Sequence, residues 1–457
     1  MSATFNSLGV GGFTTSEEQV LNPSEYNPFN PIEYDDETEK LIHTEIYPQS
    51  AQSGKNNVPF HFILPADPVR FTNLRNIRFS GELRVWNSTT EAEPATTEDW
   101  SVINNYQQSI ISHVNCKIND QEINDPASKT YAYRSFIETL ANYTKNYKDT
   151  VLSTSGWAED EALAGKGKFS CKKTDDKFNQ ACLDRREGIA TGAWREFDLL
   201  LHHDVITTIR NLPPGFRIEF TITRTSDNFL FVQPETNTNT YTIELRRVHL
   251  KMERREVAER VLKNYLSGAG SKISRLPLTR NFVRTYPVVA GQTDFSCYNI
   301  INTDQFPTKI LIGFVTQEAY DGTVNTNPYY FEWVPMQQAS LLVNSVHEPQ
   351  TPLNTTITTN KRLSVFHYFL HNTGGDQRDS LCGTVDYDKF YGGYHLLPFD
   401  LTPNKDNGAK RQRMSGGTIT VSMKAEAALD HNIVVILYAS YDSSIEAKGS
   451  EVFTRTF

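Results

Sequence analysis

Hydrophobic and polar residues alternate along most of this chain, in short segments separated by turn residues. The longest such segment is 71–86, where Ile77, Phe79 and Leu83 alternate with polar and charged residues. Successive side chains of a β-strand point to opposite faces of a sheet, so this period of two indicates strands with one buried face. The same pattern predicts strands at 42–46, 59–63, 114–123 (a pair turning at Asn119-Asp120), 194–201, 216–225, 241–252, 278–289, 295–301, 309–316, 341–346, 394–399, 417–427 and 433–441.

The period changes to that of a helix in three places. Residues 130–147 carry apolar side chains on one helical face, with Ser128 as the expected N-cap. An aromatic run at 363–371 stops at Gly374-Gly375, and a charged run at 255–266 stops at the glycines of 267–271. The apolar face of the first helix consists of Tyr133, Phe136, Ile137, Leu140, Tyr143 and Tyr147.

The order of these elements occurs twice. The tripeptide Phe-Asp-Leu stands at 197–199 and again at 399–401, each time after an aromatic helix and before two further strands. A repeated tripeptide in a matching order of elements indicates an internal duplication. Many short strands with one inserted helix per half predict an all-β protein with short inserted helices, built as two tandem jelly-roll β-sandwiches.

The expected division of the chain follows from this order. A flexible acidic N-terminal arm at 1–40 precedes a first jelly roll at 41–254, a helical linker at 255–277 and a second jelly roll at 278–457. The arm has too little apolar surface to offset the entropy of ordering. A polar stretch at 153–187 is expected to be a long loop or insertion.

Charge and cysteine content exclude some classes of function. The chain of 457 residues has a net charge of −9, and the arm holds eight acidic residues against Lys40 alone. Such an arm would be repelled by phosphates, so sequence-specific nucleic-acid binding is not expected. Five scattered cysteines favour reduced thiols over a disulfide framework. No apolar run approaches the roughly 20 residues of a membrane span, and no signal peptide is apparent.

Motifs with chemical meaning are weak or absent. Gly165-Lys166 lacks the other residues of a phosphate-binding loop, and Gly268 and Gly270 follow a helix where a dinucleotide site needs them to open one. No nucleophile elbow occurs. We therefore assign no catalytic, cofactor-binding or metal-binding residues and expect no enzyme activity, cofactor or small-molecule substrate. The candidates weighed and set aside are the histidine pairs His367/His371 and His202/His203, the pair Cys171/Cys182, the basic cluster Arg246, Arg247, Lys251, Arg254, Arg255, Arg260 and Lys263, which is interleaved with glutamates, and the short basic run 410–413.

An ordered series of segments resembles a known family. The carriers are VINNYQQSIISHVNCKINDQEIN at 102–124, 131–143, 212–229, the joint at 242–289, FDLTPN at 399–404 and GGTITVSMKAEAALDHNIVVILYASYDSSIEA at 416–447. Over residues 41–445 the chain resembles the double jelly-roll major capsid proteins of Polinton-like elements, adintoviruses and virophages, in the wider adenovirus hexon-like lineage. The arm and residues 153–187 match poorly, and the latter are expected to form a variable outer loop.

The resemblance implies a structural protein of a DNA-virus particle. Three chains would form a pseudo-hexagonal homotrimeric capsomer of an icosahedral shell, in contact with neighbouring capsomers and with penton and minor capsid proteins. The protein would be made in the host cytosol, assembled in the nucleus or a cytoplasmic factory, and located in the virion. The alternative is a tandem β-sandwich binding module of lectin type. An enzyme on a β-sandwich is a third possibility. Assembly distinguishes the first class, glycan binding the second and substrate turnover the third.

Overall fold

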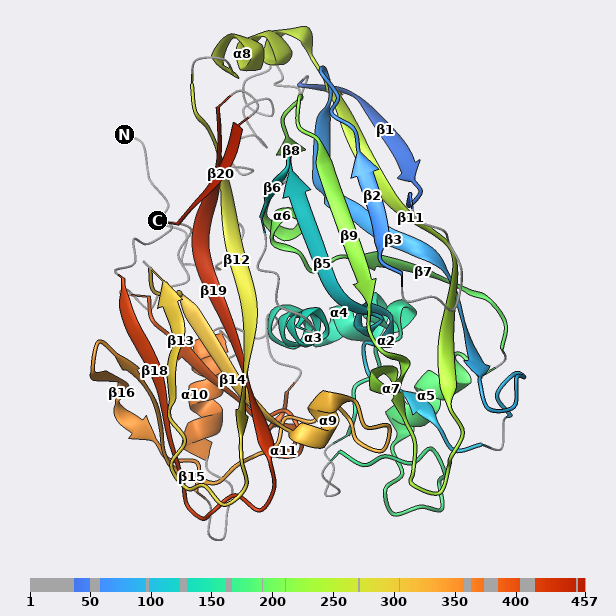
Figure 1. The fold of residues 1–457 in the computed structure, drawn as a ribbon, viewed down its shortest axis with the longest axis vertical. Helices are drawn as coiled ribbons and strands as arrows, with labels where there is room; N and C mark the ends of the chain where they lie inside the picture. The colour runs from blue at the N-terminus through green and yellow to red at the C-terminus, as the bar shows by residue number, and fades with distance from the viewer. Residues whose placement is uncertain are drawn as a thin grey trace, which may run out of the picture.

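The computed structural model describes residues 37–456 apart from 50–57, 96–97, 124–129, 162–166, 191, 210, 270–271, 304, 357–362, 374–384, 403–415 and 449–450. Two β-sandwiches lie side by side with their strands roughly along the long axis of the molecule (Figure 1). The first half of the chain forms one sandwich and the second half forms the other. Helix α3 crosses between them.

The first sandwich consists of two antiparallel sheets. One has the strand order β1-β11-β3-β7, with the short β8 paired to β3, and the other has the order β2-β9-β5-β6. Alternate side chains such as Phe62, Phe79 and Phe220 are fully or almost fully buried between the two sheets. The strands are β1 (Thr38–Ile46), β2 (Phe60–Leu64), β3 (Phe71–Asn87), β5 (Ile111–Ile118), β6 (Gln121–Glu122), β7 (Arg195–Leu200), β8 (Asn211–Leu212), β9 (Ile218–Arg224) and β11 (Tyr241–Val257); β4 (Ser101–Val102) and β10 (Phe231–Val232) pair with each other.

The second sandwich repeats this topology. Its sheets have the orders β12-β19-β14-β17, with β20 on β19, and β13-β18-β15-β16. Taken in chain order, its strands occupy the same places as β1, β2, β3, β5, β6, β7, β9 and β11 of the first half. The two Phe-Asp-Leu tripeptides fall at the equivalent strands β7 and β17, so the predicted duplication and jelly-roll architecture are confirmed. The strands are β12 (Ser274–Val288), β13 (Cys297–Thr303), β14 (Lys309–Thr316), β15 (Met336–Val343), β16 (Val346–Leu353), β17 (Leu396–Asp400), β18 (Gly417–Ala425), β19 (Ile433–Lys448) and β20 (Glu451–Thr456).

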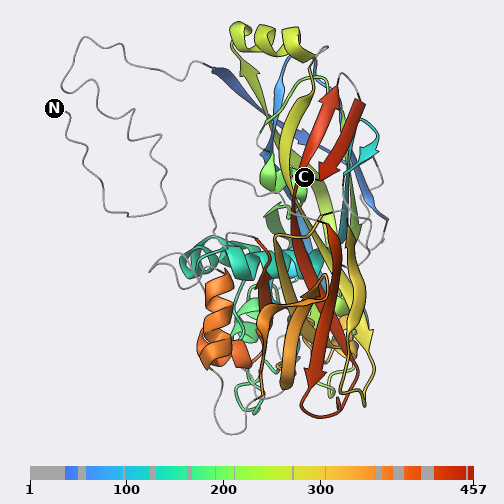
Figure 2. The same ribbon diagram turned by 90° about the vertical axis from the view of Figure 1, so that its left-hand side faces the viewer.

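Short helices are inserted between the strands. Helix α3 follows β6 in the first half, and α10 follows the equivalent strand β16 in the second half; Figure 2 shows both helices on the same side of the sheets. The helices are α2 (Tyr106–Ser109), α3 (Tyr131–Asn142), α4 (Lys145–Thr150), the 3₁₀ turn η1 (Leu152–Ser155), α5 (Gln180–Glu187), α6 (Asp204–Thr208), α7 (Asp227–Leu230), α8 (Glu259–Ala269), α9 (Gln317–Asp321), α10 (Leu363–Thr373) and α11 (Tyr387–Tyr391).

The helix expected at 130–147 is two helices. Tyr143 has an extended backbone, and the Thr144 hydroxyl accepts a hydrogen bond from the Tyr147 amide at the start of α4. A side-chain cap of this kind satisfies an amide that would otherwise need an intrahelical partner. Tyr147 therefore belongs to α4, where its ring stacks on Tyr143 at 4.9 Å. The expected N-cap, Ser128, lies outside the described residues.

The limits of the arm and of the linker helix also differ from the prediction. Strand β1 begins at Thr38, which pairs with Val257, so the last residues of the expected arm belong to a sheet. The same ladder extends β11 beyond 254 and delays the helix to Glu259–Ala269. Strand β12 then begins at Ser274. Residues 1–36 of the arm lie outside the described part of the chain.

Several of the described residues in 153–187 are packed against the rest of the protein, in contrast to the expected outer loop. Trp157 and Cys182 are buried, and Arg185 is buried with its guanidinium 2.7 Å from Asp160. Arg185 also donates to the carbonyl oxygens of Val102 and Ala158. Part of the polar composition of the segment therefore belongs to paired, buried groups.

Deleting residues 1–36 is expected to leave the free energy of unfolding of the unassembled protein within about 0.5 kcal/mol, because the deleted sequence offers little apolar surface to a core. Deleting residues 1–46 is the control. This variant removes β1 and its pairing with β11 and should be clearly less stable. Chemical denaturation of both variants measures this. A large loss in the shorter deletion would show that the arm is part of the fold.

Candidate functional site: the seam between the two jelly rolls

Helix α3 lies in the seam between the two sandwiches. All of its residues from Tyr131 to Leu140 are buried, including the charged ones. A helix at a protein surface normally keeps its charged side chains on a face exposed to solvent. One side of it packs on β5 and α2 of the first jelly roll, and the other packs on β12 of the second. The helix is therefore covered by both halves of the chain.

Aromatic rings of both halves meet on α3. Phe136 stacks on Tyr329 of the second half, with ring centroids 4.1 Å apart, and also contacts Trp157, Phe331 and Tyr394. Aromatic pairs of this kind contribute about 0.5–1.5 kcal/mol each beyond their buried area. The cluster therefore joins α3 and the 153–187 insertion to the second jelly roll.

A buried charge cluster lies beside these rings. The Arg134 guanidinium is 2.8 Å from the Glu138 carboxylate, one turn along α3, and 2.6 Å from the Asp204 carboxylate at the start of α6. The other Glu138 oxygen is 2.7 Å from Nδ1 of His202. One guanidinium thus bridges two carboxylates from separate elements of the first jelly roll.

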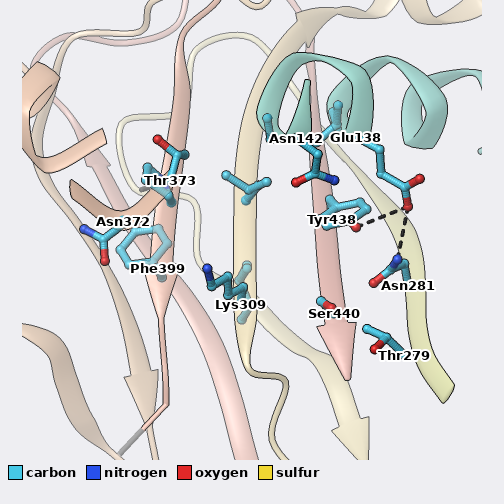
Figure 3. A pocket seen from close by; sticks show the side chains of 15 residues that line it. Glu138, Asn142, Thr279, Asn281, Lys309, Asn372, Thr373, Phe399, Tyr438 and Ser440 are labelled. Atoms are coloured by element: carbon cyan, nitrogen blue, oxygen red, sulfur yellow. Dashed lines mark hydrogen bonds between the residues drawn. The ribbon is translucent and has the colours of Figure 1, made fainter. Parts of the chain in front are cut away.

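The second jelly roll contributes neutral partners to the same cluster. The Asn281 side-chain amide and the Tyr438 hydroxyl both donate to Glu138, at 3.1 and 3.2 Å (Figure 3). The Asn281 backbone amide donates to Asp204, and its carbonyl oxygen accepts from Arg134. Strands β12 and β19 are therefore held on α3 by directional hydrogen bonds to buried charges.

The pKa values of the two carboxylates move in opposite directions. Burial alone would raise the pKa of Glu138, but the Arg134 charge and the hydrogen bond with His202 lower it to about 2. Burial raises the pKa of Asp204 above its ordinary value, and Arg134 and the Asn281 amide only partly oppose this. Glu138 therefore carries the stabilised negative charge at the seam.

A second polar junction lies further along the seam. The Asp160 carboxylate, paired with Arg185, accepts a hydrogen bond from Asn327 of the second jelly roll at 3.4 Å. The Asp160 carbonyl oxygen accepts from the Tyr394 hydroxyl at 3.2 Å. The insertion at 153–187 thus belongs to the joint between the halves.

A cavity of about 230 Å³ remains between α3 and the sheet of the second half (Figure 3). It is lined from α3, β12, β14, β17, β19 and the end of α10, and includes Glu138, Lys309 and Phe399. Pockets for drug-sized ligands usually exceed about 300 Å³. The Glu138 carboxylate at its edge is already hydrogen-bonded across the seam, so the arrangement is suited to holding two domains together.

The residues weighed for metal or nucleic-acid binding occupy other roles. His367 and His371 are exposed on α10, His203 is the N-cap of α6, and Cys171 and Cys182 are buried. Within the described residues, no group of three or more His, Cys, Asp or Glu side chains is placed to hold a metal ion. The run 410–413 lies outside those residues.

The basic cluster is a salt-bridged surface, as the interleaved glutamates predicted. Arg246 and Arg247 pair with Glu82, Arg254 pairs with Asp67, and Lys263 pairs with Glu259. Pairing of this density leaves little net positive charge for phosphate groups. In the described part of the chain, no helix is long and apolar enough to cross a membrane.

Sequence reasoning did not find the buried charge cluster. One signal was present, because Arg134 and Glu138 are the two charged residues of this helix and stand four residues apart. Their partners Asp204, Asn281 and Tyr438 are far apart in the sequence and are brought together only by the fold.

Comparisons with known proteins bear on the whole architecture. No protein-family model matches the sequence. The chain is 21% identical over 348 residues to an uncharacterized protein of Caenorhabditis elegans, covering 75% of this chain and 78% of the nematode protein.

Solved structures match over nearly the full length. The mavirus major capsid protein matches with a TM-score of 0.55 at 9% identity, covering 100% of this chain and 97% of the other. A chain of the Sputnik virophage gives 0.56 at 11% identity, covering 95% and 92%, and the Faustovirus major capsid protein gives 0.52 at 8%, covering 94% and 92%. The resemblance to double jelly-roll major capsid proteins is thereby confirmed, and both halves of the chain together have the fold of these proteins.

Proposed function

We propose that the protein is a major capsid protein, the structural subunit of homotrimeric, pseudo-hexagonal capsomers in an icosahedral virus shell. The observation that supports this most directly is the match of the whole double jelly roll to major capsid proteins. The lectin-like alternative is not favoured, because those matches include both sandwiches and their relative placement.

The buried seam supports the same proposal. A subunit of a shell must keep its two sandwiches at a fixed angle, because every contact with a neighbour depends on it. Rigid aromatic contacts between the halves, and hydrogen bonds from the second half to the buried Glu138 of the first, provide such a joint. Two similar domains per chain and three chains around an axis would place six similar sandwiches in a ring, and closed rotational symmetry would satisfy each interface.

The remaining expectations belong to this proposal. The protein acts without catalysis, contacts neighbouring capsomers and penton and minor capsid proteins, and resides in the virion after synthesis in the host cytosol and assembly in the nucleus or a cytoplasmic factory. Its first jelly roll runs from β1, which begins at Thr38, to the end of β11 at Val257, and its second begins with β12 at Ser274, with α8 between them and the acidic arm before them.

Light scattering of the purified protein is expected to give a particle of three times 51.9 kDa, and negative-stain class averages should show a nearly six-fold outline. Obligate interfaces of this kind commonly bury upwards of about 2,000 Å², so the trimer should persist at micromolar concentration. A glycan array is the parallel test of the alternative. A monomer at micromolar concentration, or a particle with two-fold symmetry, would contradict the capsomer.

A further inference from the structure

The two equivalent sheets of the two jelly rolls are covered very differently. In the second half, β14, β17 and β19 are buried on both faces for most of their length. In the first half, the equivalent strands β3 and β7 alternate between buried and partly exposed residues, and edge strand β1 is mostly exposed. A jelly roll needs only one buried face per sheet, so the extra burial in the second half has a separate cause.

The first jelly roll supplies part of this cover, together with α10 of the second half, which packs on β17. Helix α3 lies across the outer face of the second-half sheet, with Ile137 and Glu138 over β12, β14, β17 and β19. The Gly313 position on this outer face is closed by Phe331, which contacts Phe136 of α3. The corresponding outer face in the first half has no such cover among the described residues.

The two helices at equivalent positions show the same asymmetry. Whereas α3 is buried on nearly all sides, α10 buries only Val365, Phe366 and Phe369. Its other side presents Leu363, His367 and His371 at a spacing of four, and Leu363 is 54% exposed. Within the described chain, an outward helix face and an outward sheet face are thus left over, one in each half.

The open sheet and α10 lie apart from each other, one in each jelly roll. In Figure 1, β1 and β11 run along the right-hand side and the second jelly roll occupies the left. Surfaces placed in this way can meet only between copies, in a head-to-tail contact that closes into a ring when the rotation permits.

The open sheet face has the side chains of a protein–protein contact. Arg84 lies between the rings of Trp86 and Trp194, 4.7 Å from each centroid, and Arg246 lies 4.0 Å from the Trp194 ring. Glu244 and Glu82 pair with these two arginines and hold the stack in place. Tryptophan and arginine dominate the binding energy of interfaces, and side chains already ordered lose less entropy on binding.

We propose that this Trp-Arg face of the β1-β11-β3-β7 sheet binds the second jelly roll of another copy of this chain, with α10 of that copy taking the place that α3 takes inside the subunit. This proposal rests on the capsomer proposed above and specifies the two surfaces that meet at each contact between subunits.

Two single variants test the sheet face. Trp194→Ala removes the ring between Arg84 and Arg246, and Glu196→Lys reverses a carboxylate that is 75% exposed at the edge of the same face. Each is expected to weaken trimer association at least about 30-fold, the effect of losing one dominant contact. Sedimentation velocity over a concentration series measures this, and thermal unfolding of the dissociated subunit should stay close to wild type.

Glu122→Lys is the matched control, an equal charge reversal on exposed β6 in the other sheet of the same jelly roll. It should leave the association unchanged. If the wild type is a trimer and the Trp194→Ala and Glu196→Lys variants form trimers equally well, the proposed interface is wrong but the capsomer proposal is unaffected. A monomeric wild type would overturn both.

A photo-crosslinking experiment identifies the surface of the second copy that Trp194 faces. A benzoylphenylalanine residue in place of Trp194 should link to residues 363–373 of a second copy, giving a product of twice the subunit mass on a denaturing gel. Links confined to the same subunit, or to another part of the second copy, would overturn the assignment of α10.

Discussion

Replacing Glu138 by glutamine is expected to lower the free energy of unfolding by about 3 kcal/mol at neutral pH. The variant keeps the size of the side chain but leaves Arg134 with Asp204 as its remaining carboxylate in the cluster. Removing one partner of a buried ion pair usually costs about 3–5 kcal/mol, because the other charge stays out of water. The lower end applies here because Asp204 still faces the guanidinium.

The pH dependence of this loss has a defined sign. The pKa of Glu138 lies at about 2 in the folded protein, below its ordinary value of 4.5. A carboxyl whose pKa is lowered by folding stabilises the protein fully above the ordinary value, and this contribution is lost as the pH falls toward 2. The difference in stability between wild type and Glu138→Gln should therefore shrink from about pH 4.5 downward. Asp204, whose pKa is raised by burial and in part by the Glu138 charge, contributes to stability with the opposite sign.

Urea denaturation of both proteins between pH 2.5 and 7 measures this difference. The control is Asp149→Asn, which breaks the exposed Lys145–Asp149 pair one helix further along the chain. An exposed pair is worth less than about 1 kcal/mol, so this control should change stability little at any pH. A Glu138→Gln variant as stable as the control, or a difference independent of pH, would contradict the role assigned to the cluster.

The sequence predicted most of the long strands well, both from alternating segments and from continuous runs of apolar β-forming residues. Strand β14 matches the predicted 309–316 residue for residue, and the turn at Asn119-Asp120 appears with both residues in the left-handed region. Left-handed pairs of this type suit two-residue hairpin turns. One of the missed strands, β16, contains Pro349 and Pro352, which an edge strand tolerates but which obscure the alternating pattern.

The buried polar groups were much harder to predict. The insertion at 153–187 is polar in composition, yet Arg185 is buried there because Asp160 and two carbonyl oxygens surround it. A charged residue is buried only where partners are supplied, and the sequence does not show partners that the fold brings from elsewhere. For the same reason the sequence did not predict the seam, where Glu138 accepts a hydrogen bond from Tyr438 of β19.

Replacing Phe136 by alanine is expected to have the largest effect of the substitutions considered, a loss of about 3–5 kcal/mol in the free energy of unfolding. The side chain is 1% exposed, and its ring touches Trp157 of the insertion and Tyr329 and Tyr394 of the second jelly roll. Deleting a buried phenylalanine loses the transfer free energy of the ring and leaves a cavity that neighbours fill only partly.

Because Phe136 lies at the seam, its replacement should destabilise both jelly rolls. Its loss should increase amide hydrogen exchange in β12 and β14 of the second jelly roll as well as in α3, because these elements meet at the seam. Phe62→Ala is the control, an equally buried ring whose aromatic neighbour Phe79 belongs to the first jelly roll. It should destabilise by a similar amount while exchange in β12 and β14 stays near wild type. A Phe136→Ala variant whose exchange changes only within the first jelly roll would show that the rings at the seam do not couple the two halves.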